Sequence, residues 1–278
     1  MNVAVTGASG HVGGRLATEL ARRGHTVRPL TRADGDVADR EAMLTALDGI
    51  EAAYYLVHGL SGDGDFEETE RRGAREFSTA ARERGVQRLV YLGGIVHDAD
   101  LSPHLRSRRE VGEILRSSGV PTIELRASIV VGEGSASFEL VKTMVESLPT
   151  IASPDWLDHL AQPIATDDVL EYLIAALDVP LDQGAVYEIG GADRVRYRDL
   201  VNEVAARLDR PQREVTIPVP SVPALPAQLA SLLPESLRLP LHLLESLQYD
   251  TDVRDDAALR DFSVRPRGLR AAVDAALA

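Results

Sequence analysis

Short apolar runs alternate with amphipathic segments of helical length over the first two thirds of the chain. Alternation of this kind is typical of a parallel sheet with helices packed on both faces. Six apolar runs are predicted to be strands, at residues 2–6, 26–30, 52–57, 87–93, 121–131 and 185–189. Six amphipathic segments are predicted to be helices, at residues 12–23, 40–47, 66–84, 105–117, 136–147 and 167–177. The pattern therefore predicts an α/β fold with a doubly wound parallel sheet.

The pattern changes after Arg210, where a leucine-rich stretch at 218–247 contains six of the 15 prolines. Proline excludes a long regular helix, so short helices and turns with an apolar surface are expected. The stretch is interpreted as part of a capping domain; the wall or lid of an apolar substrate pocket and a membrane-surface contact are the alternatives. Residues 1–192 are predicted to form the sheet domain, with 131–160 contributing to the substrate side. Residues 193–278 are predicted to form a small, mostly helical domain.

Composition narrows the class of protein. The 278 residues suffice for a sizeable core, and a formal charge of −13 argues against nucleic-acid binding. The absence of cysteine excludes disulfides and thiolate zinc sites, and no histidines and carboxylates show metal-ligand spacing, so no metal is expected. The start at Met1 lacks a basic leader region, and 18 consecutive apolar residues occur nowhere. These features predict a cytoplasmic protein without a membrane span.

A glycine-rich turn follows the first predicted strand and opens the first predicted helix, with the sequence Gly-Ala-Ser-Gly-His-Val-Gly at residues 7–13. Gly7 permits a tight turn, Gly10 lets the backbone approach a pyrophosphate, and Gly13 lets helix and strand pack closely. The order of strand, turn and helix predicts a Rossmann-type dinucleotide site. Ser9, His11 and Val12 are expected to contribute contacts to the same nucleotide.

The residues after the second predicted strand bear on the choice of nucleotide. An NAD site generally has a carboxylate there, whereas this chain has Thr31 and Arg32, and its first carboxylate is Asp34. The planar guanidinium of Arg32 can pair with a 2′-phosphate. NADP is therefore favoured, with NAD as the alternative and a solvated loop charge as the other interpretation of Arg32.

These features resemble the short-chain dehydrogenase/reductase superfamily, in particular its extended and atypical members with an NmrA-like NAD(P)H-binding domain. The likeness covers nearly the whole chain and rests on the order of several short motifs. Besides the glycine turn they are Gly35-Asp36-Val37, Tyr55-Leu56-Val57-His58, Arg88-Leu89-Val90-Tyr91-Leu92-Gly93-Gly94, Leu125-Arg126-Ala127, Gln162-Pro163-Ile164 and Asp167-Asp168-Val169. The resemblance implies that Asp36 contacts the adenine, with Val37 adjacent. It also implies that Val57 and His58 lie beside the cofactor, His58 through backbone contacts and packing more than proton transfer.

The resemblance also shows which catalytic residues are missing. Such enzymes usually carry a Ser or Thr beyond a central strand and a Tyr-x-x-x-Lys motif on the next helix. In this chain Gly93-Gly94-Ile95 stands in place of the hydroxyl residue, and His104-Leu105-Arg106-Ser107-Arg108 stands in place of the Tyr-x-x-x-Lys motif. The only lysine, Lys142, has Phe138 four residues before it and does not restore the pair.

His104 and Arg108 are the candidate catalytic residues, because positions four apart share one face of a helix. Arg108 is expected to bind ribose hydroxyls and to lower the pKa of His104, leaving a neutral imidazole near pH 7. Two alternatives remain open. In the first, both side chains are surface residues of a protein without a proton relay. In the second, His97 or Asp98 of the adjoining loop is the catalytic residue.

The favoured hypothesis is an NADP-dependent atypical oxidoreductase that transfers hydride between NADPH and an apolar or aromatic small molecule. Conjugate reduction of an enone, quinone or imine does not require the missing Tyr and Lys, because solvent or the substrate can supply the proton. The alternatives are a non-catalytic NADP(H)-binding sensor or structural protein, and an isomerase or cyclase that retains the nucleotide. A monomer or homodimer without a nucleic-acid partner is expected.

Overall fold

The computed structural model describes residues 1–57, 66–97, 101–147, 150–152, 155–180, 184–210, 213–215 and 248–278. Three features of the sequence fall outside these ranges, namely His58, Asp98 and the proline-rich stretch at 218–247. Predictions that concern them therefore remain predictions.

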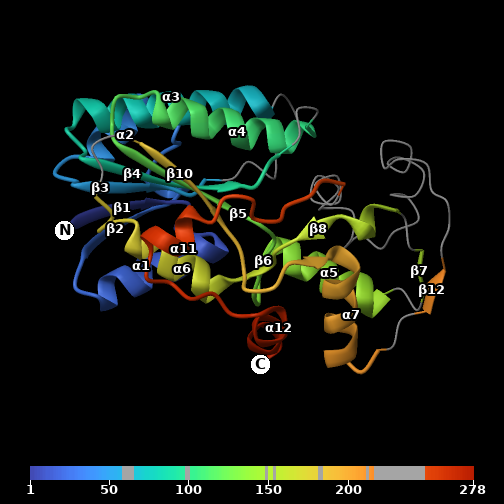
Figure 1. Cartoon of the computed structure of the whole chain (residues 1–278). Helices are drawn as coiled ribbons and strands as arrows, with labels where there is room; N and C mark the ends of the chain where they lie inside the picture. Colours follow the sequence, from blue (N-terminus) through green and yellow to red (C-terminus); the bar gives the residue numbers. More distant parts are fainter. Residues whose placement is uncertain are drawn as a thin grey trace.

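Six parallel strands form the central sheet (Figure 1). In spatial order they are β10 (Ala185–Ile189), β5 (Thr122–Ala127), β4 (Arg88–Gly94), β3 (Ala52–Tyr55), β1 (Asn2–Thr6) and β2 (Thr26–Leu30). In β1, Val3 is in register with Val27 on one side and Ala52 on the other. The chain runs outward from β1 to β2 and then returns to β3, so the winding reverses between β1 and β3. In doubly wound sheets, ligands bind beyond the carboxyl ends of the strands at this reversal.

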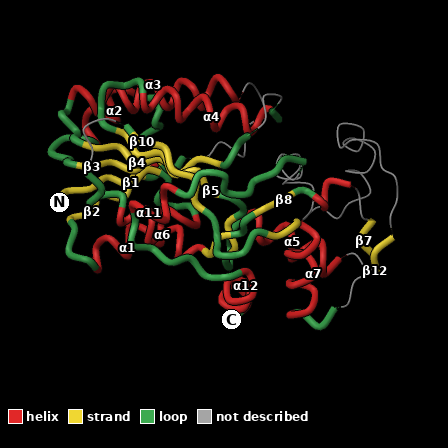
Figure 2. The backbone as a smooth tube through the Cα atoms, in the orientation of Figure 1, coloured by secondary structure: helices red, strands yellow, loops and turns green. Residues whose placement is uncertain are grey.

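Helices cover both faces of the sheet (Figures 1 and 2). On one face lie α2 (Arg40–Ala46), α3 (Phe66–Glu83) and α4 (Pro103–Arg116), and on the other α1 (His11–Arg22), α6 (Thr166–Ala175) and α11 (Ala257–Asp261). Each face has its own apolar core. The α1 side buries Leu16, Tyr54 and Tyr172, and the α3 side buries Phe77 and Tyr91. This arrangement confirms the predicted doubly wound α/β fold.

A third apolar cluster holds together α5 (Ala136–Ser147), α7 (Tyr197–Arg207) and α12 (Leu269–Leu277). Its buried members include Phe138, Leu200 and Val273. Short elements lie around it, namely η2 (Asp155–Asp158), β6 (Val130–Val131), β8 (Leu160–Ala161), β9 (Ile164–Ala165) and β11 (Val195–Arg196). Elsewhere, η1 (Arg32–Asp34) follows β2, and β7 (Thr150–Ala152) pairs with β12 (Arg213–Val215). In Figures 1 and 2 this cluster lies beside the sheet. The division at residue 192 remains a proposal, since α11 packs on the sheet and α12 in the third cluster.

One strand prediction is wrong in its extent. The apolar run at 121–131 forms two strands, because β5 ends at Ala127 and the chain resumes as β6, paired with β9. The amide of Ser128 donates to the carbonyl of Ile189 on the sheet edge, whereas Val130 is already in register with Ile164. Both parts are largely buried, so hydropathy did not reveal the break between them. The other predicted strands and helices are present with ends shifted by two residues or fewer.

Helix α4 is fixed against the sheet by a buried carboxylate. Glu124 of β5 is 1% exposed, and its oxygens lie 2.9 Å from Arg116 Nε and 2.7 Å from Arg126 Nε. A buried carboxylate requires such paired donors to offset its lost hydration. The helix also approaches closely at Gly112, where a Cβ atom would lie 2.6 Å from a Glu124 oxygen. These contacts hold α4 along β4 and β5, and its first turns lie at the carboxyl end of β4.

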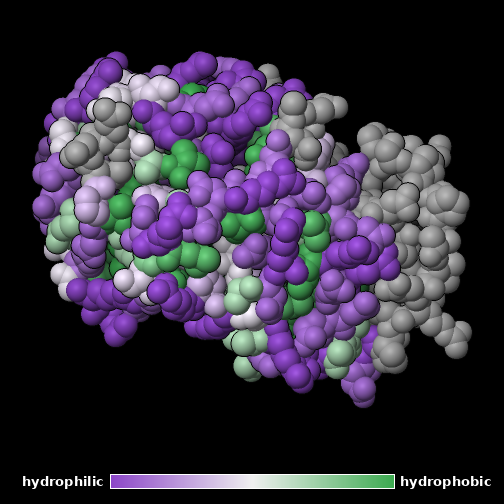
Figure 3. All heavy atoms as spheres, viewed as in Figure 1, coloured by the Kyte–Doolittle hydropathy of each residue, from purple (hydrophilic) through white to green (hydrophobic). Residues whose placement is uncertain are grey.

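Hydrophilic residues cover most of the face shown in Figure 3, with smaller hydrophobic areas between them. Among the described residues, Met1 and Leu259 are the exposed large hydrophobic side chains. No helix in these parts of the chain combines the length and apolarity needed to cross a bilayer. The same residues contain no group of three His, Asp or Glu side chains that could hold a metal ion.

Candidate functional site

A cavity of about 1260 Å³ lies where the winding of the sheet reverses. Its walls come from the carboxyl ends of β1, β2, β3 and β4, from the start of α4, and from residues 127–141. Tyr197 and Thr251 also line it, although they are far from these segments in sequence. The cavity therefore joins the central sheet to the third apolar cluster.

The glycine turn forms one end of this cavity, and its geometry requires glycine. Gly7 has a φ of +67°, and a Cβ atom there would lie 2.5 Å from the carbonyl oxygen of Leu56 on the neighbouring segment. A Cβ atom at Gly13 would lie 2.2 Å from the Gly7 carbonyl oxygen. Gly10 is the N-cap of α1, and its amide donates to the Gly7 carbonyl at 2.9 Å. The turn and helix are therefore packed as closely as backbone atoms permit.

This end of the cavity fits the pyrophosphate of a dinucleotide. The first turn of α1 contains no acidic residue, so the partial positive charge of the helix terminus is not offset by a carboxylate there. The glycines leave the surface of the turn without side chains at the positions nearest the cavity. Backbone amides can then reach phosphate oxygens directly.

The structure brings together the residues that the sequence predicts for the cofactor. The cavity is lined by Gly7, Ser9, Gly10, His11, Val12, Gly13, Arg32, Asp36, Val37 and Val57. His58 follows Val57 but lies outside the described residues. The role of each of these residues in nucleotide binding stays a prediction.

The segment after β2 exposes the guanidinium of Arg32, whereas its first carboxylate, Asp34, is hydrogen-bonded within the segment. Asp34 accepts hydrogen bonds from the amide and the hydroxyl of Thr31, each at 2.8 Å. Those bonds close a capping box around η1 and lower the pKa of Asp34, chiefly through the Thr31 amide. Arg32 is exposed in the same turn and lines the cavity. Asp36 also lines it, with one carboxylate oxygen accepting from the Ala38 amide at 2.9 Å.

His11 links the glycine turn to the opposite wall. Its Nε2 lies 3.0 Å from the hydroxyl of Thr166, a buried residue at the start of α6. Its ring also packs against the backbone of Gly134, where an added Cβ would lie 3.3 Å from Nδ1. Burial lowers the pKa of His11, and the nearby Arg15 lowers it further. The imidazole therefore favours the neutral form more than a free histidine does.

His104 and Arg108 lie one turn apart on α4, and both line the cavity. The hydroxyl of Ser102 caps this helix by accepting from the Leu105 amide, and Pro103 occupies its first position. His104 is buried, at 8% exposure. Its burial excludes the alternative of a solvent-exposed surface position, while its catalytic role stays a prediction.

Arg108 contacts Leu92 and Tyr91 of β4. Its guanidinium donates to the carbonyl of Leu92 and lies over the ring of Tyr91, 5.0 Å from the ring centroid. The Tyr91 hydroxyl in turn donates to the carbonyl of Arg108 at 2.9 Å. These contacts place the guanidinium at the carboxyl end of β4, where Gly93, Gly94 and Ile95 also line the cavity.

The alternative catalytic candidate His97 is directed elsewhere. Its Nε2 lies 2.8 Å from the carbonyl oxygen of Asp252, and its Nδ1 lies 3.7 Å from a carboxylate oxygen of Glu188. His97 does not belong to the cavity lining. Asp98, the other residue named with it, lies outside the described residues.

Several cavity residues were not predicted from the sequence. Glu70 of α3 is 9% exposed, lines the cavity and accepts a hydrogen bond from the hydroxyl of Ser107. Its place in a helix rich in glutamate and arginine gave no signal that this carboxylate is the buried one. Ser128, Tyr197 and Thr251 line the opposite part of the cavity and come from three separate segments. No local motif in the sequence connects these three hydroxyls.

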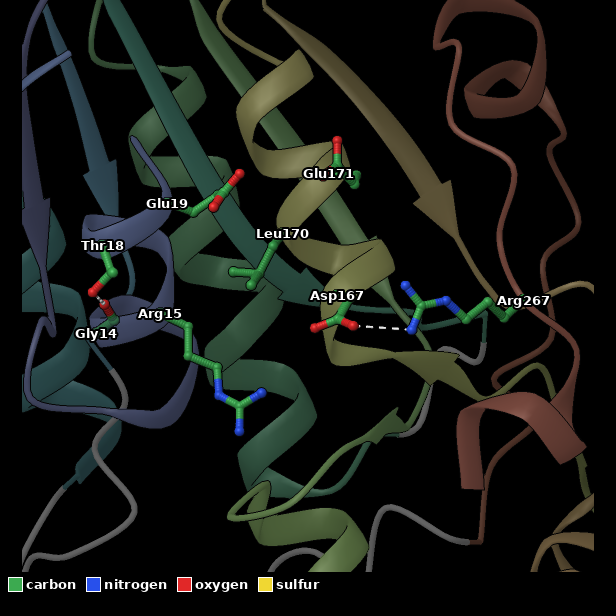
Figure 4. Close-up of a pocket in the computed structure, with 8 residues that line it drawn as sticks. All are labelled: Gly14, Arg15, Thr18, Glu19, Asp167, Leu170, Glu171 and Arg267. Carbon is green, nitrogen blue, oxygen red and sulfur yellow. Dashed lines mark hydrogen bonds and ion pairs between the residues drawn. The ribbon is translucent and has the colours of Figure 1, made fainter. Parts of the chain in front are cut away.

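A second, smaller cavity of about 590 Å³ lies between α1 and α6 (Figure 4). Five charged side chains line it, namely Arg15, Glu19, Asp167, Glu171 and Arg267. Figure 4 shows Asp167 and Arg267 directed toward each other, at an N–O distance of 2.9 Å. Such a lining suits ion pairing between elements better than an apolar ligand. None of the residues predicted for the functional site belongs to it.

The family of the chain follows from a match over most of its length. Residues 1–261 match the model of the NmrA-like family. The chain belongs to the NmrA-like family. This finding confirms the resemblance that the motifs indicated.

Curated relatives match this NmrA-like protein over limited regions. Sterol demethylase protein B of Methylococcus capsulatus is 34% identical over 110 residues, which are 33% of this chain and 34% of that protein. The 3-beta-hydroxysteroid dehydrogenase of Mycolicibacterium neoaurum is 34% identical over 112 residues, which are 32% of this chain and 31% of that protein. The chain spans about a third of the length of these relatives.

Solved structures share the fold over nearly the whole chain. MoeE5 in complex with UDP-glucuronic acid and NAD superposes with a TM-score of 0.73 at 20% identity, covering 99% of this chain and 97% of that one. A short-chain dehydrogenase/reductase superfamily protein from Agrobacterium tumefaciens with bound NAD gives a TM-score of 0.73 at 16% identity, covering 100% and 96%. At these identities the likeness shows the Rossmann-type fold alone.

Proposed function

We propose that this NmrA-like protein is an NADP-dependent oxidoreductase that transfers hydride between NADPH and an apolar or aromatic small molecule. The observation that carries the proposal is one continuous cavity with two different ends. Glycine backbone lines one end, and apolar side chains with a few polar groups line the other. A nucleotide and a second small molecule can therefore meet within a single cavity.

Binding of a nicotinamide nucleotide is supported by the glycine turn. Its backbone is shaped by contacts that exclude a Cβ atom at Gly7 and Gly13, and it faces the cavity at the start of α1. Both solved structures named above contain NAD and share this fold. In the proposed complex the amides of the turn bind the pyrophosphate and Asp36 contacts the adenine.

Preference for NADP is supported by the turn after β2. A carboxylate positioned for ribose hydroxyls would repel a 2′-phosphate, and Asp34 is instead bonded to Thr31. Arg32 is exposed at the cavity and offers a planar set of donors to a phosphate. The local electrostatics therefore favour the phosphorylated nucleotide.

An apolar substrate is supported by the other end of the cavity. Its lining includes the side chains of Ile95, Leu105, Ile129, Leu140 and Val141. Burial of a ligand against such side chains is favourable by about 25 cal/mol per Å² of apolar surface. The relative from Mycolicibacterium neoaurum is named for a hydroxysteroid, a largely apolar molecule, which agrees with this choice.

The proposed chemistry divides between the cofactor and the protein. Bound NADPH supplies a hydride, and the protein orients the substrate, excludes water and manages the accompanying proton. Arg108 is held at the carboxyl end of β4, where its guanidinium can bind ribose hydroxyls as the resemblance implies. His104, one turn earlier and buried at the cavity wall, is the proposed proton donor or acceptor.

The proposal is tested by binding and by turnover. A thermal-shift titration with NADPH, NADP⁺, NADH and NAD⁺ is expected to show stabilisation by the nucleotides, strongest for the phosphorylated pair. Oxidation of NADPH, followed at 340 nm, is then measured with a panel of quinones, enones and imines. Nucleotide binding without oxidation across the panel would favour a sensor or structural protein. Product formation with unchanged cofactor absorbance would favour an isomerase or cyclase.

A further inference from the structure

Three buried hydroxyl groups form a hydrogen-bonded chain in the wall of the large cavity. The Tyr197 hydroxyl lies 2.8 Å from Thr251 Oγ1, which lies 3.0 Å from Ser128 Oγ. These residues come from the start of α7, from the segment before α11, and from the turn between β5 and β6. All three line the cavity, and each is at most 7% exposed.

A count of protons shows that this hydroxyl chain has one donor to spare. Three hydroxyls carry three protons, and each of the two contacts between them uses one proton. Ser128 Oγ also accepts from the Gln162 amide at 3.0 Å, which uses an acceptor site and no hydroxyl proton. Whichever way the bonds run, one O–H remains without an acceptor among the described residues.

The spare donor is a neutral hydroxyl at ordinary pH. Burial raises the pKa of Tyr197, so its phenol stays protonated under physiological conditions. Serine and threonine hydroxyls do not ionise in this range. A buried donor without a partner is unfavourable, and a ligand acceptor in the cavity would satisfy it.

We propose that the chain formed by Ser128, Thr251 and Tyr197 donates one hydrogen bond to an acceptor oxygen of a ligand in the apolar end of the cavity. The inference rests on the proposed function, because it takes that end as the substrate site. The neighbouring Ile129 and Val141 also line the cavity and bind the ligand's apolar body. The substrate class is thus an apolar molecule that carries an acceptor oxygen, such as a carbonyl. A neutral donor selects this oxygen without the cost of burying a charge.

The recognition is tested with two probes of nearly equal shape. Menadione has two carbonyl oxygens on a methylated bicyclic ring, and 2-methylnaphthalene is the same skeleton without them. The chain has no cysteine, so menadione cannot form a thiol adduct with it. Affinities are measured by calorimetry or ligand-observed NMR with NADP⁺ present, because the oxidised nucleotide permits binding without turnover. We expect menadione to bind about five- to tenfold more tightly than the hydrocarbon.

The three hydroxyls of the chain are then removed one at a time. Ser128→Ala, Thr251→Val and Tyr197→Phe each delete one hydroxyl and keep most of the side chain's volume. The variant that lacks the donating hydroxyl is expected to lose the preference for menadione while its affinity for 2-methylnaphthalene stays the same. Ser117→Ala is the matched control, since the Ser117 hydroxyl donates to the Glu113 carbonyl at the exposed C-cap of α4.

The outcomes separate this inference from the proposed function. Equal affinity of the native protein for the two probes, or no binding of either, overturns the hydroxyl site. Persistence of the preference in all three variants overturns it as well. Menadione preference that depends on one of the three hydroxyls, in a protein that does not oxidise NADPH with any acceptor, supports the hydroxyl site and overturns the proposed oxidoreductase. Oxidation of NADPH without a preference for menadione over 2-methylnaphthalene supports the oxidoreductase and overturns the hydroxyl site.

Discussion

The substitutions Gly10→Ala and Gly13→Ala are expected to separate the two roles of the glycine turn, which are nucleotide binding and close packing of α1. Gly10 has a φ of −84°, which alanine can adopt, and an added Cβ would meet only the Gly7 carbonyl oxygen, at 3.2 Å. At Gly13 the Cβ would lie 2.2 Å from that same oxygen and 2.8 Å from the carbonyl carbon. The first substitution affects the nucleotide side of the turn, and the second affects the packing of α1 against the turn.

The magnitudes follow from these distances. A carbon–oxygen contact is normally about 3.3 Å or longer, so the Gly13→Ala contact is about 1 Å too short. Backbone atoms cannot rotate away, which places the cost near ~3 kcal/mol. The better helix propensity of alanine offsets about 0.5–1 kcal/mol of this cost. The net loss of about 2 kcal/mol lowers the melting temperature by about 4–8 °C. For Gly10→Ala, a poorer N-cap costs about 0.5 kcal/mol, or about 1–2 °C.

Calorimetric or fluorescence titration with NADPH, together with thermal unfolding, measures both effects. Gly10→Ala is expected to raise the Kd for NADPH at least ~10-fold with little change in melting temperature, because its methyl group occupies the path of the pyrophosphate to the amides. Gly13→Ala is expected to raise the Kd for NADPH and to lower the melting temperature. An unchanged Kd in Gly10→Ala would refute the placement of the pyrophosphate on this turn. An unchanged melting temperature in Gly13→Ala would refute the packing argument.

Three further predictions concern the preference for NADPH, the proton transfer by His104 and the pH dependence of stability. Arg32→Ala should weaken NADPH about tenfold and leave NADH unchanged in parallel titrations; equal losses for both would remove the 2′-phosphate contact. His104→Phe should leave nucleotide affinity intact and reduce turnover in the NADPH oxidation assay, and unchanged turnover would exclude this histidine from the mechanism. His11 has a lowered pKa in the folded state, so the unfolded chain binds more protons just below the ordinary histidine pKa of 6.5, and stability falls as pH drops through that range. Thermal unfolding from pH 7.5 to 5.5 should therefore show a larger decrease for the native protein than for His11→Gln, and parallel decreases would contradict this.

The fold was predictable because its signals are local. Strands and helices were located from runs of apolar residues and from helical spacing, and the glycine turn was located from its position after the first strand. Each of these features depends on residues within about 20 positions of one another. The break between β5 and β6 escaped prediction because burial on both sides hides it from hydropathy.

The candidate site was predictable only in part, for a related reason. His104 and Arg108 share a helix, so their common face followed from spacing, whereas the guanidinium's contacts with Leu92 and Tyr91 depend on how α4 packs against β4. Glu70 is one of several acidic residues on α3, and only packing shows that it is buried at the cavity.

The sequence by itself determined the order of strands and helices, the dinucleotide turn and the absence of the usual Tyr-x-x-x-Lys pair. The tertiary structure decided what lies opposite that turn. Ser128 and Thr251 are 123 positions apart, and their hydroxyls meet because β5, α7 and the segment before α11 converge on one cavity. A hydrogen bond of this kind depends on distances between segments that no local pattern encodes. Serine, threonine and tyrosine also occur at many surface positions, so their residue types alone do not mark a site.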